Sequence, residues 1–183
     1  MDFQQSRTFT NLQTAYQFEL QASTKYTMFG NQARDEVLIE IGEAFDVIAR
    51  NERFIAHRLR TLIKGGETST EENLREAIQD EENAEYNIYL EFSRVADEEG
   101  YTDIASLFNG IANIKLNHVL ELQTLENNLA TGQLFCKQQE GVWICIGCGN
   151  ILTGVCAPEI CPICGFPQGY YRLLSYYTGR TTP

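Results

Sequence analysis

The stretch CIGCGNILTGVCAPEICPICGFPQGYYRLL, residues 145–174, contains two C-x-x-C pairs separated by twelve residues. Cys145 and Cys148 form the first pair, and Cys161 and Cys164 form the second. Each pair can hold an ion with two thiolates from a tight turn, and two such turns close a tetrahedral site of four sulfurs. Glycines beside the pairs favour such turns. The spacing therefore predicts a small metal-binding domain rather than two disulfides.

The identity of the metal is open on spacing alone, because Zn²⁺ and a single iron ion accept the same four thiolates. Four aromatic residues close to the pairs, Trp143, Phe166, Tyr170 and Tyr171, are more than a structural zinc site needs. We expect them to form an apolar shell that limits water access to the sulfurs, as an electron-transfer iron site requires. The pattern favours iron, with zinc as the alternative.

Two further cysteines, Cys136 and Cys156, fall outside this spacing. We interpret them as packing residues rather than reactive thiols, and we expect a reducing compartment for the chain. The first ten residues are polar and do not resemble a signal peptide, and no run of ~18 apolar residues occurs. We therefore expect a cytoplasmic protein with no membrane span.

Composition divides the chain into a helical part and a turn-rich part. Apolar residues recur at helical spacing over residues 1–131, whereas all four prolines follow residue 157. We predict helices over 8–29, 32–64, 70–98 and 102–129, forming a four-helix bundle, and a small metal domain with short strands over 132–183. The net charge of −11 argues against a nucleic-acid partner, because phosphates would be repelled.

A polar side chain interrupts the apolar stripe of each predicted helix. These residues are Glu19, Glu52, Glu81 and His118, and Lys115 lies one turn before the histidine. Buried carboxylates are costly unless they are paired or bind a metal. Three glutamates and a histidine are typical ligands of a carboxylate metal site in a bundle. The alternative is a metal-free network in which Lys115 neutralises the glutamates.

With these motifs in place, the sequence resembles the rubrerythrin family, in which a ferritin-like four-helix bundle with a di-iron site precedes a rubredoxin-like domain. Residues 145–174 resemble the rubredoxin-like domain, and ARNER (49–53), ENLREAI (72–78) and FSRVADEEGYTDIASLF (92–108) resemble helical segments of the family. The resemblance implies iron at the four cysteines. It also implies that the four inward residues above are metal ligands, and that the hydroxyls of Tyr26 and Tyr89 hold ligand carboxylates.

Three of the seven di-iron ligand positions differ from the family pattern. Ile55 replaces the histidine of the second helix, and Lys115 replaces the bridging glutamate of the fourth. Ala84 replaces a glutamate of the third helix, unless the register shifts by one residue so that Glu82 and Glu85 serve instead.

The replacement at position 115 reverses a charge, and an ammonium group there would repel both metal ions. His57 does not compensate for the histidine lost at position 55, because it points roughly 200° away from the direction of that ligand. We expect either one metal ion in the bundle, held by Glu52, Glu81 and His118 with Glu19, or none.

The connection between the second and third helices is short. In ferritin-like bundles these helices run parallel, but residues 65–70 reach only ~20 Å while a 28-residue helix is ~42 Å long. We therefore expect a homodimer that exchanges helix pairs, so that Glu19 and Glu52 meet Glu81 and His118 of the other chain. A plain up-down-up-down bundle is the alternative.

Three functions are compatible with these features. The first is an electron carrier that works through the four-cysteine iron centre with a redox partner protein, its bundle keeping an incomplete metal site. The second, which the resemblance implies, is a peroxidase that reduces hydrogen peroxide to water at a di-iron site. The third is a non-catalytic structural or regulatory protein that binds zinc or iron.

Overall fold

The computed structural model describes residues 2–82 and 86–174 of the chain. The chain forms two compact units, one up to Ser69 and one from Thr70 onward. Within the described ranges no helix is both long enough and apolar enough to cross a membrane.

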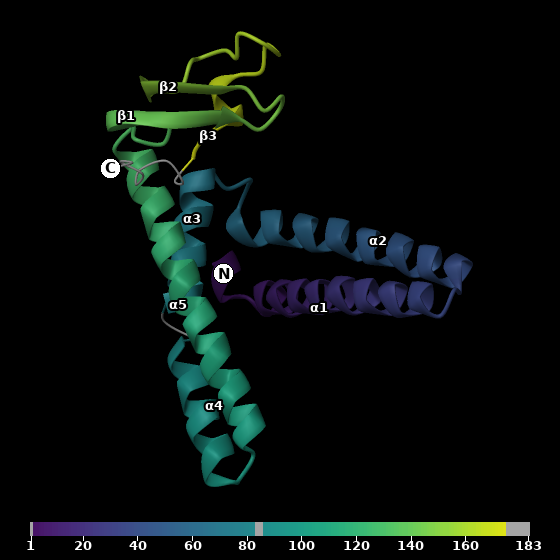
Figure 1. Cartoon of the computed structure of the whole chain (residues 1–183). Coiled ribbons are helices and arrows are strands. Elements are labelled where there is room, and N and C mark those ends of the chain that lie inside the picture. The colour runs from purple at the N-terminus through teal and green to yellow at the C-terminus, as the bar shows by residue number, and fades with distance from the viewer. Residues whose placement is uncertain (1, 83–85, 175–183) are drawn as a thin grey trace. The chain divides into compact units, whose positions relative to one another are not determined.

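The first unit is a helical hairpin. A 3-10 turn over Phe3–Gln5 leads into α1, Arg7–Asp35, and α2, Ile39–Lys64, returns beside it (Figure 1). The Ser6 hydroxyl caps α1 by accepting a hydrogen bond from the Phe9 amide at 3.1 Å. The buried residues of these two helices are all small, which lets their backbones approach closely: Ser23, Gly30, Ala33, Gly42, Ala49 and Ala56.

The helix break predicted near residue 30 is wrong. α1 continues to Asp35, and the turn lies at residues 36–38. Gly30 is buried inside the helix, where an added Cβ would lie 2.8 Å from Oδ1 of Asp46 and 3.3 Å from the carbonyl oxygen of Gly42. The glycine therefore permits close helix contact and does not end the helix.

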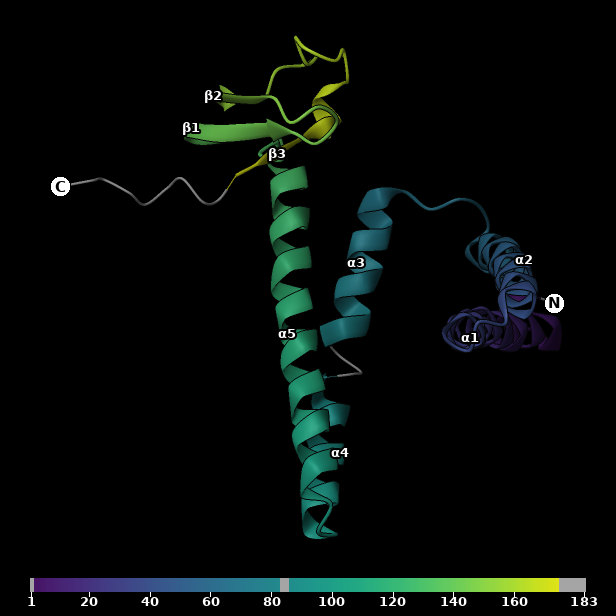
Figure 2. The ribbon, with the colours of Figure 1, turned by 45° about the vertical axis from the view of Figure 1, so that its right-hand side comes forward.

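In the second unit, α3 (Thr70–Asp80) and α4 (Tyr86–Glu98) pack one after the other along α5 (Thr102–Ala130), as Figure 2 shows. The single helix expected over 70–98 is therefore divided. Glu81 and Glu82 have π-helical conformation, and residues 83–85 lie outside the described ranges. A π turn adds one residue to a helix, which changes the face that the following residues present.

The hairpins α1–α2 and α4–α5 form a repeat, in which a residue of the first corresponds to the residue 63 positions later in the second. Four of the six buried positions of the first reappear in the second as Ala96, Ala105, Ala112 and Val119. The ring contacts among Tyr26, Phe29 and Phe45 reappear among Tyr89, Phe92 and Phe108. The turns also agree, because the Leu38 amide donates to the Ala33 carbonyl and the Tyr101 amide to the Ala96 carbonyl, each at 2.8 Å.

A three-stranded antiparallel sheet follows α5 in the chain. β1 (Cys136–Cys145) is central and pairs with β2 (Ile151–Cys156) on one side and with β3 (Tyr171–Leu173) on the other. A 3-10 turn, Gln168–Tyr170, precedes β3. The core of this part contains Trp143, Cys145, Ala157, Cys161 and Tyr171.

The repeat identifies a strained turn at Val37, where φ is 61°, in the left-handed region; its equivalent is Gly100, with φ of 86°. A β-branched residue in this conformation costs roughly 1–3 kcal/mol. Val37 is 78% exposed, and nothing lies within 4 Å of a Cβ placed on Gly100. Any effect of exchanging these residues therefore comes from the backbone and not from packing.

We expect Val37→Gly to raise the free energy of unfolding by about 1 kcal/mol, because relief of strain exceeds the entropy cost of glycine. The reciprocal Gly100→Val is expected to lower it by roughly 1–3 kcal/mol. Urea unfolding followed by far-ultraviolet circular dichroism measures both. A loss of stability in Val37→Gly would contradict the assignment of strain to this turn.

Candidate metal centres

Two loops of the same form bring the predicted cysteines together. In the first, the Cys145 amide donates to the Asn150 carbonyl and the Gly149 amide donates to the Cys145 carbonyl, both at 2.8 Å. In the second, the amides of Cys161 and Gly165 make the equivalent hydrogen bonds at 2.8 and 2.9 Å. Gly149 and Gly165 have φ of 80° and 73°, a conformation that glycine adopts without strain. The chain therefore turns sharply just after each C-x-x-C pair.

The four sulfur atoms fit a single tetrahedral ion. They all lie within 4.8 Å of one another, and the Cys145–Cys164 and Cys148–Cys161 sulfur distances are both 3.7 Å. An ion about 2.3 Å from each of four tetrahedral sulfurs would separate the sulfurs by about 3.8 Å. In the part of the chain that the structure describes, no second group of three or more histidine, cysteine or acidic residues lies this close together.

The four cysteines differ in their surroundings. Cys145 and Cys161 are buried, Cys164 is half-buried and Cys148 is exposed. The nearby Tyr171 hydroxyl, with two backbone amides, lowers the pKa of Cys161 to about 6, because these polar groups stabilise the thiolate. Burial raises the pKa of Tyr171, so that the phenol stays protonated, and its oxygen makes no hydrogen bond to the described residues. This part of the site therefore favours a thiolate before any ion binds.

Two of the four aromatic residues form the expected shell. Trp143 and Tyr171 are buried in the core beside the cysteines. Phe166 and Tyr170 are about 40% exposed, and their ring centroids lie 4.4 Å apart. The Phe166 ring covers Gly147 so closely that a Cβ there would overlap it. These two rings cover the loop from outside and leave part of the site at the surface.

The helical residues of the second unit meet as the sequence predicts, but as an ion pair. Lys115 Nζ lies 3.3 Å from each carboxylate oxygen of Glu81, and His118 Nδ1 lies 3.5 Å from Oε2. The side chains of Glu81 and Lys115 are each 20% exposed. Oε2 is buried and accepts no hydrogen bond from the described residues. Lys115 thus provides the positive charge closest to Glu81, and the two residues do not fit a carboxylate-bridged metal pair.

The remaining predicted ligands, Glu19 and Glu52, belong to the first unit. The neighbouring Glu52 carboxyl group, followed by burial, raises the pKa of Glu19. His57 is exposed, with Nε2 3.5 Å from Glu67, in agreement with its exclusion from the ligands. The four predicted ligands come in two pairs from different units.

The repeat also bears on the register of the third helix. Tyr26 lies seven residues after Glu19, whereas Tyr89 lies eight residues after Glu81. The π-helical turn at Glu81 accommodates the additional residue, so that Glu81 is the equivalent of Glu19. Glu82 is exposed, which argues against the shifted register; the other residues of that alternative, at 84 and 85, lie outside the described ranges. The role of the two tyrosine hydroxyls stays a prediction.

The interpretation of Cys136 and Cys156 as separate packing residues is wrong, because the two form a disulfide. They lie opposite each other in the β1–β2 ladder, with Cα atoms 4.0 Å apart. Their separation of twenty residues in the sequence gives no indication of this contact.

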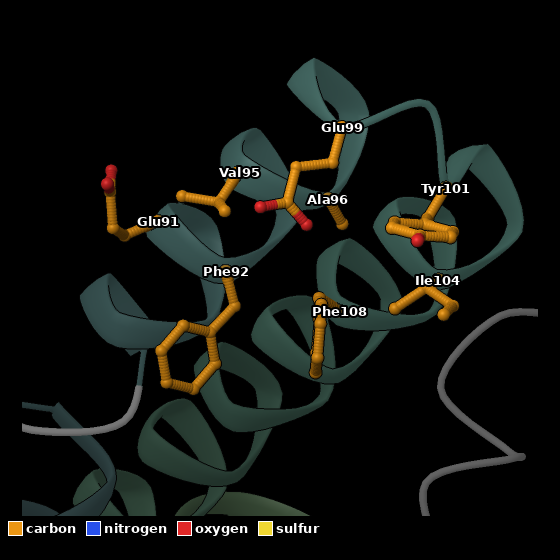
Figure 3. A pocket seen from close by; sticks show the side chains of 8 residues that line it. All are labelled: Glu91, Phe92, Val95, Ala96, Glu99, Tyr101, Ile104 and Phe108. Atoms are coloured by element: carbon orange, nitrogen blue, oxygen red, sulfur yellow. The ribbon is translucent and has the colours of Figure 1, made fainter.

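A hollow of about 560 Å³ opens beside the turn between α4 and α5 (Figure 3). Its walls are mainly apolar and include Phe92, Val95, Tyr101, Ile104 and Phe108, with Glu91 and Glu99 as its charged residues. Among the described residues, those that line the hollow include no close group of three metal-ligating side chains. We therefore assign it no chemistry and treat it as part of the apolar surface of this hairpin.

Comparison with known proteins places these features in one family. The family model for "Rubrerythrin, rubredoxin-like domain" matches residues 143–172, and the model for "Rubrerythrin" matches residues 10–72. The four cysteines therefore form a rubredoxin-like metal site. The expected fold class, mainly α with ferritin-like helices followed by a small rubredoxin-like domain, is confirmed.

Curated relatives match over nearly the full length. A rubrerythrin of Nitratidesulfovibrio vulgaris is 33% identical, covering 92% of this chain and 95% of its own. A rubrerythrin of Clostridium perfringens is 34% identical, covering 92% and 94%. A solved structure of nigerythrin in a mixed-valence state is 25% identical over 92% of this chain and 87% of its own, with a TM-score of 0.34. By its sequence, its matched segments and its four-cysteine site, the chain belongs to the rubrerythrin family.

Proposed function

We propose that this protein is a cytoplasmic electron carrier whose working centre is an iron ion held by the four cysteines. The observation that supports this best is the one-sided exposure of the site. Cys145 and Cys161 are buried in the core, whereas Cys148 is exposed. Electrons can therefore pass at the Cys148 edge, while the rest of the site is shielded from water.

The surface around Cys148 suits a redox partner protein. Ile146 and Ile163 are 60% and 71% exposed, and each lies inside one of the C-x-x-C pairs. Exposed apolar side chains at this edge would be covered in a transient complex. The partner would then approach the sulfurs without intervening water.

Iron, when bound, supplies a one-electron redox couple, which zinc lacks. The protein's contribution is to hold four thiolates in fixed positions. The nearby Tyr171 hydroxyl and backbone amides lower the pKa of Cys161 to about 6, which favours negative charge on this sulfur. Trp143 fills the core behind the site, and its indole nitrogen donates to the Gly154 carbonyl at 3.0 Å. These contacts limit rearrangement when the charge of the centre changes.

The helical part is proposed to hold one metal ion or none. A peroxidase would need a metal pair to deliver two electrons at once, and Lys115 opposes that arrangement. At ~4 Å and an effective dielectric constant near 20, an ammonium group repels each unit of metal charge by ~4 kcal/mol. The ion pair between Lys115 and Glu81, at 3.3 Å, supports the carrier over the peroxidase.

We also propose that two chains associate by exchanging helix hairpins. Only residues 65–69 join α2 to α3, which is too few to return along a 26-residue helix of ~39 Å. Apolar residues of the predicted inner stripes are exposed in the single chain, among them Ile41, Ile48, Leu107 and Ile114. A second copy would cover them and would bring Glu19 and Glu52 to Glu81 and His118 of the partner.

If the protein is an electron carrier of this kind, it should bind about one iron ion per chain, at the four cysteines. Removing two sulfurs with Cys148→Ser and Cys164→Ser should abolish iron binding and the thiolate-to-iron absorption, because two thiolates cannot hold the ion. The matched double variant Cys136→Ser/Cys156→Ser also removes two sulfurs and should keep the iron. Elemental analysis of the native protein checks this; zinc alone, or three irons per chain, would contradict the carrier.

Restoring the family ligands should restore a metal pair. We expect Lys115→Glu combined with Ile55→His and Ala84→Glu to gain about two metal ions per helical site, because the repulsive charge becomes a bridging carboxylate. Lys64→Glu makes the same charge change at the exposed end of α2 and should gain none. Elemental analysis measures the number of metal ions bound by each variant. An unchanged number in the triple variant would contradict the proposed ligand register.

If two chains exchange hairpins, dimer formation should depend on the short connection between α2 and α3. The native protein should have twice the 20.8 kDa chain mass by light scattering. Inserting about 20 Gly and Ser residues after Gly66 lets one chain fold back on itself and should shift the protein toward monomer. A similar insertion after Gly132 serves as the control and should leave the dimer intact. A monomeric native protein would rule out the exchange.

A further inference from the structure

We propose that Cys136 and Cys156 form a redox-active site that exchanges with dithiol reductants and regulates how firmly the neighbouring four-cysteine site retains its metal. The proposal does not depend on which metal is bound or on electron transfer. It rests on where the disulfide lies in the sheet and on the residues beside it.

The disulfide lies at a weakly paired end of the sheet. Cys136 is the first residue of β1 and Cys156 the last of β2. The register of the ladder shifts between Cys136 and Gly141, and regular pairing begins only at Gly141 with Gly154. The sulfur–sulfur bond is thus a main link between the strands at this end. Breaking it leaves this end held by the backbone hydrogen bond between Ala157 and Phe135 and by the irregular ladder up to Gly141.

A reductant can reach the bond from solvent. Cys156 is exposed and Cys136 is half-buried, and residues 138–140, which follow in β1, are also exposed. Buried disulfides that only cross-link a core are shielded from attack, whereas exposed ones exchange readily. The access of this bond favours exchange chemistry over a purely structural role.

The bond is coupled to the metal site through its two neighbours in the sequence. Phe135 packs against the core of the metal domain, and Ala157 is part of that core together with Cys145 and Cys161. The Ala157 amide donates to the Phe135 carbonyl at 2.8 Å. The disulfide therefore joins the two residues that flank this hydrogen bond, which holds Phe135 against the core that contains Cys145 and Cys161. Opening the disulfide should loosen this contact.

The chemistry balances with a dithiol as reductant. A thiolate of the reductant attacks the Cys156 sulfur, the bond to Cys136 breaks, and the Cys136 thiolate takes up a proton. The second thiol of the reductant then attacks the mixed disulfide, so that Cys156 leaves as a thiol and the reductant becomes a disulfide. Hydrogen peroxide can reverse the change. One thiolate attacks it to give a sulfenic acid and a hydroxide ion, which takes up the proton that the thiol had released and becomes water. The other thiol then attacks the sulfenic acid sulfur, and a second water leaves as the disulfide forms.

The test uses the full chain with its metal bound. The protein is equilibrated in glutathione buffers of graded redox ratio or with dithiothreitol, then alkylated under native conditions and weighed by mass spectrometry. We expect complete and reversible conversion between no added groups and two, at Cys136 and Cys156. Trp143, the one tryptophan, reports the change by fluorescence, because it bonds to Gly154 of β2. A bond that resists excess dithiothreitol until the protein unfolds would overturn the exchange site, as would two free thiols that peroxide does not join.

The proposed regulation of metal retention is tested separately, by the rate at which the protein releases its metal. Transfer of the metal to an excess of chelator should be about fivefold faster after reduction, because local opening controls release. Cys136→Ser/Cys156→Ser should show the fast rate with or without dithiothreitol. Equal rates for oxidised and reduced wild-type protein would overturn the regulatory role, and this comparison needs no variant to fold. Loss of metal binding itself would appear as altered stoichiometry, and it is distinguishable from a change of rate.

Discussion

The contact on which the helical part depends is the ion pair between Lys115 and Glu81. Both side chains are four-fifths buried, and the ammonium nitrogen lies 3.3 Å from each carboxylate oxygen. A carboxylate in this position needs a positive partner, which in a carboxylate metal site is the ion itself. Here the chain supplies its own cation. This ion pair is one reason why the proposed function places the chemistry at the cysteine site.

The repeat of 63 residues allows the predicted ligand positions of the two hairpins to be compared directly. Lys115 is the equivalent of Glu52, and His118 is the equivalent of Ile55. Against the ligand pattern that the family resemblance implies, the first hairpin has the carboxylate and lacks the imidazole, whereas the second has the imidazole and lacks the carboxylate. In the proposed dimer, the hairpins would together provide three carboxylates, one imidazole and one ammonium. That set suits a single cation or a charge network better than two adjacent ions.

Much of this architecture was predictable from the sequence. The C-x-x-C spacing located the metal loops because those ligands are local in sequence. Helical periodicity predicted the inward residues, of which Glu81 and Lys115 form an ion pair, while the side chain of His118 is 49% exposed. The hairpin turn and the helix division were missed, because Gly30 serves a contact with another helix and the π turn at Glu81 leaves no compositional signal. The bond between Cys136 and Cys156 depends on strand register, which distant residues determine together. The two pairs of bundle ligands lie in different units, so their union stays a prediction.

Assembly and charge are linked in the proposed dimer. The pKa of Glu19 is already raised, first by the neighbouring Glu52 carboxyl group and then by burial. Bringing Glu81 to this pair would add a third carboxylate and would oppose association if no cation were present. Lys115 and Glu81 belong to the same unit and are already paired in the single chain. The ammonium group of Lys115 would therefore offset the added carboxylate at each interface as soon as the dimer forms. A bundle of this kind can form before any metal is acquired, whereas one with a bridging glutamate at position 115 would depend on its ions to hold the acidic side chains together.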